Sequence, residues 1–407
     1  MNRKLVAFVL ALFAAPLLID SGVVVPVLIQ VYIAVILAVS YNMVLGQTGL
    51  LSFVHAIYFG FGGFAAVHAL RFAGNGDLPV PVPFIPLFGA AMGFAMAATL
   101  GSFTARRTGM AFAMITLCLV ELVIASAPVL GRFYGGSVDR TLPPAFFGED
   151  FVSDLSVYFV TTVWMILCLA GMAWYSRTPL GRLSNAVRDN SERVEFISFD
   201  PWVIRFSALC ASGFFAGIAG SLFAISYEFV GGETISLATS GNIIIMTYIG
   251  GIGHFAGPVF GAVLVTVLQT LLGDYTEIWG LYLGVLFVAT VMFMPKGFAG
   301  FFEQHLRLAK NGKLLLVTGP YFAALLATLW AGCGLVGLLE MISYLNESAV
   351  DEPVVSVAGI LLDTSSPWPW GVLGLIAASG LFLSHSRWQI ARHAFTLASG
   401  EEFRPGS

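Results

Sequence analysis

Residues 40–64 read SYNMVLGQTGLLSFVHAIYFGFGGF and place polar side chains and glycines in the middle of an apolar segment. The polar residues are Asn42, Gln47, Thr48, Ser52 and His55, and the glycines are Gly46, Gly49, Gly60, Gly62 and Gly63. Irregular backbone persists at membrane depth only where protein buries it or where it lines a water-filled path. The stretch therefore predicts a helix interrupted inside the membrane. A tight loop between two ordinary spans, with glycines for close helix contact, fits the same composition.

The composition around this stretch excludes a soluble globular protein. Of 407 residues, 58% are hydrophobic and 10% are charged, against roughly 25% charged in soluble domains. Because about 20 apolar residues cross the hydrocarbon core, the sequence predicts an all-α polytopic membrane protein with about ten to twelve membrane segments, including broken or re-entrant helices. The expected spans lie near 5–25, 27–46, 50–70, 84–105, 109–131, 156–175, 203–230, 258–273, 277–294, 316–341 and 368–385, with a shorter segment at 241–250.

The N-terminal residues resemble a signal peptide. Apolar character resumes at Val23, however, so we expect a first span that is retained. With the N-terminus in the cytoplasm, sixteen of the nineteen Lys and Arg residues fall on the cytoplasmic side, and only Arg71, Arg132 and Arg140 fall outside. Basic residues favour the cytoplasmic side of a membrane, and this distribution predicts cytoplasmic N- and C-termini.

Motifs for chemistry are absent from the sequence. It contains no GxxxxGK[ST], HExxH, GxSxG or DxDxDG pattern, so we expect neither an enzyme nor a metal site. A formal charge of -4, with no basic cluster longer than Arg106-Arg107, argues against nucleic acid as a partner.

Ionisable residues inside a membrane are expensive and commonly face a cavity or a partner. Glu121 is the one that lies well inside a predicted span. It is a candidate pathway residue, although capping a neighbouring broken helix would also explain it. The candidate translocation pathway set is Asn42, Gln47, Thr48, Ser52, His55 and Glu121. Small residues at four-residue spacing predict close helix packing, at Gly89/Gly93, Gly213/Gly217, Gly257/Gly261 and Gly280/Gly284.

Residues 176–200, SRTPLGRLSNAVRDNSERVEFISFD, form the most polar loop. Pro179 near its start and Pro201 after its end favour a short helix between them. Its arginines could serve only to set the topology, or they could form a docking surface.

Four ordered stretches resemble permease subunits of branched-chain amino acid ABC importers. Residues 42–56 are similar to the family signature NLxxGxxGxxSxGHA, and 178–200 to the loop PLGRxxxAxRxNxxxAxxxG. Residues 216–224, AGIAGSLFA, resemble AGLAGALYA, and 244–262 resemble LLMVVLGGxGxxxGPVxGA. The ending 293–297, FMPKG, resembles FRPxG. The resemblance covers about residues 30–300 and fits the M-type half of the permease pair better than the H-type half.

This resemblance implies a bacterial inner-membrane permease subunit of an ATP-driven importer of branched-chain or other hydrophobic amino acids, or of a related small solute. Its implied partners are a second related permease that shares the pathway, two cytoplasmic ATP-binding subunits and an extracytoplasmic solute-binding protein, all beside the lipid bilayer. No cofactor is expected in this chain, because the partner ATPase subunits hydrolyse ATP with Mg. The resemblance also implies that a cytoplasmic loop at about 178–200 couples to the ATPases, through Gly181, Arg182, Arg188, Asp189, Asn190, Glu192 and Arg193.

The implied domains are a permease domain at 1–300 and a C-terminal extension at 301–407 with a two-helix membrane hairpin. Three features depart from the family pattern: Val54 and Ser198 stand where glycine is usual, and the extension is additional. Other cargoes of such permeases, namely urea, short amides and aromatic acids, remain open. So does a different class, a self-sufficient secondary transporter or channel.

Overall fold

A computed structural model of the chain describes residues 16, 23–77, 79–126, 129, 135–141, 143, 151–294, 296–310, 314–347, 354–357 and 360–399. The predicted first span, 5–25, lies almost entirely outside the described residues. The structure divides into two compact units, of which unit 1 comprises Met1–Leu271 and Leu283–Gly300 and unit 2 comprises Leu272–Tyr282 and Phe301–Ser407.

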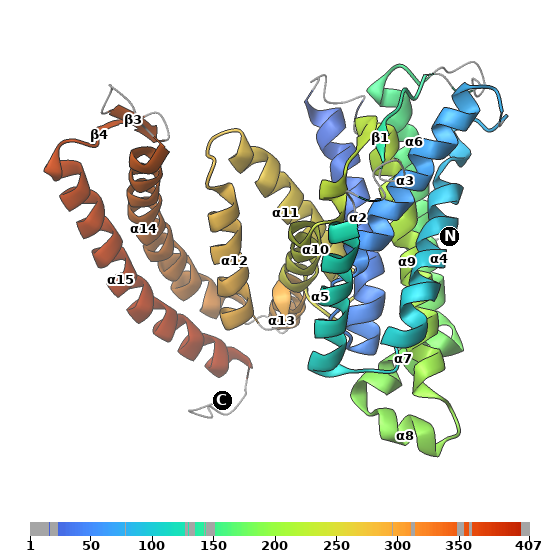
Figure 1. Ribbon diagram of the computed structural model, residues 1–407. Coiled ribbons are helices and arrows are strands. Elements are labelled where there is room, and N and C mark those ends of the chain that lie inside the picture. The colour runs from blue at the N-terminus through green and yellow to red at the C-terminus, as the bar shows by residue number, and fades with distance from the viewer. Residues whose placement is uncertain are drawn as a thin grey trace. The chain divides into compact units, whose positions relative to one another are not determined.

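Long apolar helices dominate unit 1 (Figure 1). They are α2 (Val24–Thr48), α3 (His55–Gly74), α4 (Pro86–Thr104), α5 (Gly109–Ser126), α6 (Asp154–Arg177) and α9 (Pro201–Tyr227). Shorter helices are α7 (Pro179–Asp189), α8 (Ser191–Phe196), α10 (Leu237–Gly250) and α11 (Gly257–Gly273), with 3₁₀ turns η1 (Val82–Phe84) and η2 (Gly232–Ile235). α7 and α8 lie at one end of this unit. The strands β1 (Gly136–Ser137) and β2 (Phe229–Val230) pair antiparallel at the other end.

The helices confirm an all-α polytopic membrane protein. Eight described helices are long and apolar enough to cross a membrane, and a ninth span results if α12 (Trp279–Phe293) and the first part of α13 (Gly297–Lys310) count as one helix bent by 48°. The segment predicted at 241–250 is the short helix α10, with 14 residues. A second break at 251–256 separates it from α11.

Glycines set the packing of α3, α4 and α9. A Cβ added at Gly217 of α9 would lie 2.1 Å from the carbonyl oxygen of Gly89 on α4, and one added at Gly62 of α3 would lie 2.4 Å from that of Gly217. The three backbones therefore touch without intervening side chains. This confirms the close packing predicted for Gly89/Gly93 and Gly213/Gly217.

The other two glycine pairs differ from each other. Gly261 of α11 packs directly on α10, where its Cβ would lie 1.9 Å from the carbonyl oxygen of Met246. A Cβ at Gly280 or Gly284 would meet nothing within 4 Å among the described residues. The prediction of close packing is therefore wrong for Gly280/Gly284 within this chain, because four-residue spacing marks a helix face without showing that another helix covers it.

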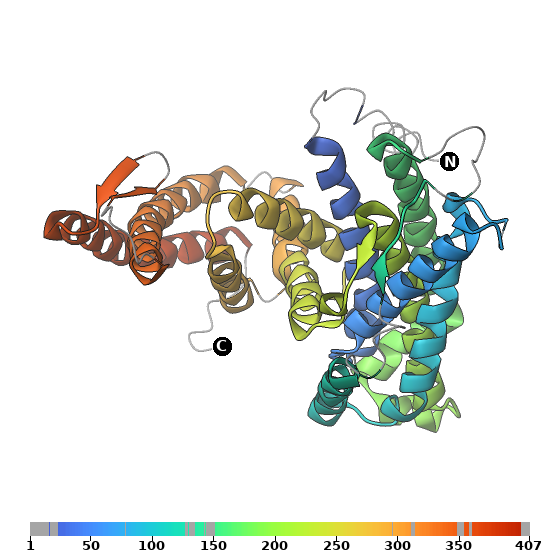
Figure 2. The same cartoon turned by 45° about the horizontal axis from the view of Figure 1, so that its top comes forward.

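Unit 2 is built on a pair of helices, α14 (Leu314–Glu347) and α15 (Pro367–Ser399), which lie side by side (Figure 2). Their connection carries an antiparallel strand pair, β3 (Val354–Val357) and β4 (Ile360–Asp363). Close approach again uses glycine: a Cβ at Gly380 would lie 2.4 Å from the amide nitrogen of Ala331.

Candidate functional site: a polar helix break and the loop that contacts it

Residues 40–64 contain the end of α2, which lies near α7 at one end of unit 1. α2 ends at Thr48, and Gly49 follows with a φ of 73°, a left-handed conformation that glycine adopts without a Cβ clash. The amides of Gly49 and Leu50 donate to the carbonyl oxygens of Leu45 and Val44 and so satisfy the end of the helix. Residues 49–54 then connect to α3, which begins at His55.

This connection runs back along α2 into the bundle. The His55 Nε2 lies 2.6 Å from the Ser212 Oγ, and the same hydroxyl donates to the carbonyl oxygen of Ser40 at 2.6 Å. Ser40 precedes the end of α2 by eight residues, or about 12 Å at the rise of an α-helix. The connection therefore runs back about two helical turns into the bundle, whereas α2 itself is continuous to Thr48, beside α7.

Buried polar atoms without partners gather at this break. Asn42, Ser52 and His55 are at most 4% exposed. Because the Ser212 hydroxyl proton goes to Ser40, His55 donates through Nε2 and its Nδ1 is an acceptor. That Nδ1, the Asn42 Oδ1 and the Ser52 Oγ have no hydrogen-bond partner among the described residues. Buried polar groups are normally satisfied, so these three atoms are the places where water or a polar solute would bind.

The two breaks of unit 1 meet at Asn42. Its Nδ2 donates to the carbonyl oxygen of His254, in the 251–256 break, at 3.4 Å. Gly46 makes room for this contact, because a Cβ there would lie 2.1 Å from the Asn42 Oδ1 and 3.2 Å from the Gly253 amide nitrogen.

The remaining pathway candidates lie elsewhere. Gln47 donates through Nε2 to the Ser176 Oγ at 2.6 Å, and the Thr48 hydroxyl donates to the carbonyl oxygen of Val44 at 2.6 Å. Gln47 thus connects the end of α2 to α6, whereas Thr48 bonds within α2. Glu121 is exposed on α5 and makes no hydrogen bond within the described part of the chain. Asn42, Ser52 and His55 thus share the buried polar environment of this connection, whereas Glu121 is exposed on another helix, α5.

The loop at 178–200 folds into α7 and α8, each with a side-chain cap. The Thr178 Oγ1 accepts from the Gly181 amide at 3.3 Å, and the Asn190 Oδ1 accepts from the Arg193 amide at 3.0 Å. Gly181 is buried, because α7 turns directly against the carbonyl oxygen of Tyr175. The other candidate coupling residues have exposed side chains: Arg182, Arg188, Asp189, Asn190, Glu192 and Arg193.

Arg188 joins this loop to the helix break. Its Nη1 donates to the carbonyl oxygen of Gly46, one of the last carbonyls of α2, and its Nε donates to the Asp189 carboxylate at 3.2 Å. A cation at a helix C-terminus is stabilised by the helix dipole. The side chain crosses over Gly49, where a Cβ would lie 2.9 Å from the Arg188 Cγ. Arg188 thus links α7 directly to the end of α2.

Ser198 keeps the backbone that a glycine would adopt. Its φ is 65°, and its amide and that of Phe199 donate to the carbonyl oxygens of Glu195 and Val194 at 2.9 and 3.2 Å. The turn after α8 therefore has a glycine-type geometry despite the departure from the family pattern. A serine here carries about 1 kcal/mol of left-handed strain or somewhat more.

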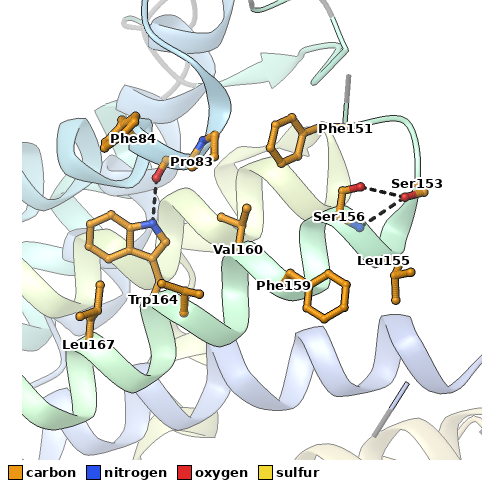
Figure 3. Close-up of a pocket in the computed structure, with 11 residues that line it drawn as sticks. Pro83, Phe84, Phe151, Ser153, Leu155, Ser156, Phe159, Val160, Trp164 and Leu167 are labelled. Atoms are coloured by element: carbon orange, nitrogen blue, oxygen red, sulfur yellow. Dashed lines mark hydrogen bonds between the residues drawn. The ribbon is translucent and has the colours of Figure 1, made fainter. Parts of the chain in front are cut away.

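Two cavities in unit 1 differ in chemistry. One, of about 610 Å³, lies between η1 and α6, and Figure 3 shows Phe84, Val160 and Trp164 facing it while the Trp164 Nε1 donates to the Pro83 carbonyl at 2.9 Å. Among the described residues, none with a charged side chain lines it. The other, here called the loop cavity, has about 530 Å³ and lies beside α7 and α8. It is lined by Thr48, Gly49, Leu50, Thr108, Val187, Arg188, Asp189, Asn190, Ser191, Glu192 and Arg205.

Sequence reasoning missed three residues. Ser212 lies within a predicted apolar span and carried no motif signal, and Arg205 stood out only as a cytoplasmic basic residue near the end of that span. Arg140, predicted only as an outer-loop charge, is 9% exposed. It donates to the Phe151 carbonyl at 2.9 Å and to the Asp154 carboxylate at 2.8 Å, and it fixes the β1 loop to the start of α6.

Comparison with known proteins identifies the family. The model described as branched-chain amino acid transport system / permease component matches residues 23–294. The chain belongs to this family. The high-affinity branched-chain amino acid transport system permease protein LivM of Escherichia coli (strain K12) is 29% identical over 340 residues, covering 76% of this chain and 77% of that protein. LivM of Salmonella typhimurium matches with the same identity and coverage.

A more distant relative is the probable branched-chain amino acid transport permease protein LivH of Methanocaldococcus jannaschii, 24% identical over 291 residues that cover 65% of this chain and 88% of that protein. No solved structure matches this chain. The match to the branched-chain amino acid permease family includes both helix breaks, α7 and α8, whereas α14 and α15 lie beyond it. The chain is a multi-pass permease subunit of an ABC importer, which is a transport system with other subunits.

Proposed function

We propose that this permease imports branched-chain or other hydrophobic amino acids, together with a second related permease, two cytoplasmic ATP-binding subunits and an extracytoplasmic solute-binding protein. The observation that carries this proposal is the Arg188 contact, which links an exposed polar loop to the broken end of a membrane helix. ATP and Mg would bind only to the partner subunits, and this chain would need no cofactor of its own.

The α7–α8 loop has the surface of a docking site for an ATPase. Arg182, Glu192 and Arg193 offer both charge signs, and the tip after α8 exposes Phe196 by 87% and Ile197 by 60%. Large exposed apolar side chains beside polar ones favour a protein partner. Rotation of the docked loop would then pull on Gly46 through Arg188.

The exposed face of α5 is the proposed wall of the pathway shared with the second permease. Glu121 lies twelve residues along α5 from Gly109, about 18 Å at the helical rise, which is deep in a hydrocarbon core of roughly 30 Å. A carboxylate that faced lipid at this depth would be costly. A water-containing path between the two permeases removes that cost.

This assignment fixes the proposed orientation. The α7–α8 end lies in the cytoplasm of a bacterial inner-membrane protein, with both termini on the same side, and the β1–β2 end faces the binding protein. Sixteen of nineteen basic residues then lie in the cytoplasm.

The test is reconstitution of the complete importer in proteoliposomes with ATP inside. We expect uptake of labelled leucine that requires ATP, both permeases and the binding protein, and no ATP hydrolysis by this chain alone. Competition with unlabelled isoleucine, urea, acetamide and benzoate separates the candidate cargoes. Uptake by this chain alone without ATP would instead establish a self-sufficient transporter or channel.

A further inference from the structure

The loop cavity is a polar space between the coupling loop and the membrane helices. Its volume of about 530 Å³ falls within the range of roughly 300–1,000 Å³ for small-molecule sites. Its walls come from the end of α2, the α4–α5 connection, α7, α8 and the first turns of α9. An occupant would therefore touch both the moving loop and the bundle beneath it.

One wall offers an unoccupied cationic donor. The Arg205 Nε is buried and has no hydrogen-bond partner among the described residues. The carboxylates of Glu195 and Asp200 attract this guanidinium from a distance, and neither forms an ion pair with it in the described part of the chain. Arg188, by contrast, already donates to Gly46 and Asp189. Arg205 lines the loop cavity and forms no ion pair among the described residues, so we assign its guanidinium group to bind an anion such as a carboxylate.

The lining also includes two acidic and two aliphatic side chains. Asp189 and Glu192 present exposed carboxylates, while Leu50 and Val187 are 2% and 4% exposed and line the same cavity. An aliphatic α-amino acid has a carboxylate, an ammonium group and an aliphatic side chain. The cavity offers a cation for the first, carboxylates for the second and apolar side chains for the third. A simple anion would be repelled by Asp189 and Glu192, and a metal cation by the two arginines.

We propose that the loop cavity binds an aliphatic α-amino acid from the cytoplasm and that this binding slows the importer. The inference rests on the proposed function, because it requires the α7–α8 end to lie in the cytoplasm. A bound amino acid would bridge Arg205 on α9 to Asp189 or Glu192 on the loop and hold α7 and α8 against the bundle. Since it would favour that one position of the loop, it would reduce the population of other positions.

The first experiment measures binding of labelled leucine to the assembled importer in nanodiscs without the binding protein. Two analogues test the recognition: 4-methylpentanoate lacks the amino group of leucine, and 3-methylbutylamine lacks its carboxylate. We expect leucine to bind at least tenfold more tightly than either analogue. Arg205→Gln should weaken leucine binding about ten- to a hundredfold, as expected for loss of a hydrogen bond from a charged donor.

Two further variants test whether a loss of leucine binding is specific to the cavity. Arg106→Gln removes an exposed arginine that lies 5.9 Å from the Trp202 ring and outside the cavity lining, and should leave leucine binding unchanged. Thr108→Val alters the cavity without removing a charge and should weaken binding several-fold even if Arg205→Gln fails to assemble. Equal binding of leucine by the wild type and by both cavity variants would overturn the proposal.

The second experiment measures ATP-driven uptake into proteoliposomes preloaded with unlabelled leucine. Internal leucine should slow the initial rate for the wild type and for Arg106→Gln, but not for Arg205→Gln. If uptake fails even without internal leucine, the proposed function is at fault. If uptake is normal and internal leucine acts equally on the wild type and Arg205→Gln, only the regulatory site is refuted.

Discussion

Replacement of Arg188 by glutamine tests whether the loop controls the end of α2. The change removes the donor to the Gly46 carbonyl and the contact with Asp189, while the polar side chain keeps its length in part. We expect insertion and folding to be normal, because the lost contacts lie at one end of the bundle, where α2 is also fixed by the Gly49 and Leu50 amides.

The magnitude follows from the environment of the guanidinium. A hydrogen bond from a charged group contributes about 1.5–3 kcal/mol, and the Arg188 side chain is 37% exposed, so water replaces part of it. We therefore expect a loss of about 1–2 kcal/mol in the docking of the loop. This corresponds to a loosened state about five- to thirtyfold more populated.

Two measurements report this loosening in the assembled importer. Hydrogen exchange of α7 and α8 amides should accelerate about five- to thirtyfold, and ATP-driven uptake should fall while ATP hydrolysis continues. The control is Arg177→Gln, since Arg177 is exposed at the end of α6, lies outside the candidate coupling set and makes no side-chain hydrogen bond among the described residues. Unchanged exchange and unchanged uptake in Arg188→Gln would refute the role assigned to this contact.

Three further predictions follow from other parts of the chain. Gly217→Ala, whose Cβ would lie 2.1 Å from a backbone oxygen, should destabilise the bundle by about 3 kcal/mol or more and lower the melting temperature in a thermal-shift assay. Gly241→Ala, whose Cβ meets nothing within 4 Å among the described residues, should leave the melting temperature unchanged. Ser198→Gly should stabilise the turn after α8 by about 1 kcal/mol and slow its hydrogen exchange; faster exchange would contradict the strain assigned there. Cys118, exposed on α5 near Glu121, should react with a membrane-impermeant thiol reagent in the assembled importer, and cargo should protect it. Cys333, exposed on α14, should not react. If neither cysteine reacts, the result would argue against a water-containing path along α5.

Local sequence patterns predicted the helices and their breaks well. Gly49 after a long apolar run, and Gly251 after a short one, mark helix ends because the backbone at each has a positive φ, 73° and 116°, that glycine adopts without strain. Glycines at four-residue spacing identified the packed Gly89/Gly93 and Gly213/Gly217 faces. This pattern failed for Gly280 and Gly284, because spacing along one helix does not say whether another helix covers it.

Such local patterns do not predict contacts between residues far apart in the sequence. The contact of Arg188 with Gly46 was not predicted, since it depends on how α7 is placed over α2. Ser212 was hidden in an apolar run, where a single polar residue carries no periodic signal. Glu121 stood out as an ionisable residue inside a predicted span, yet its exposure follows only from how α5 packs. The roles of the pathway and coupling residues stay predictions until transport is measured.

The glycine contacts among α3, α4 and α9 have a mechanical consequence. Where backbones touch directly, no side chain can change rotamer to absorb sliding, and any shift costs a collision between main-chain atoms. These three helices should therefore move as one stiff block during a transport cycle. Strain produced by nucleotide-driven motion would be concentrated in residues 49–54 and 251–256, which lie between helices. Those twelve residues would act as hinges of the importer.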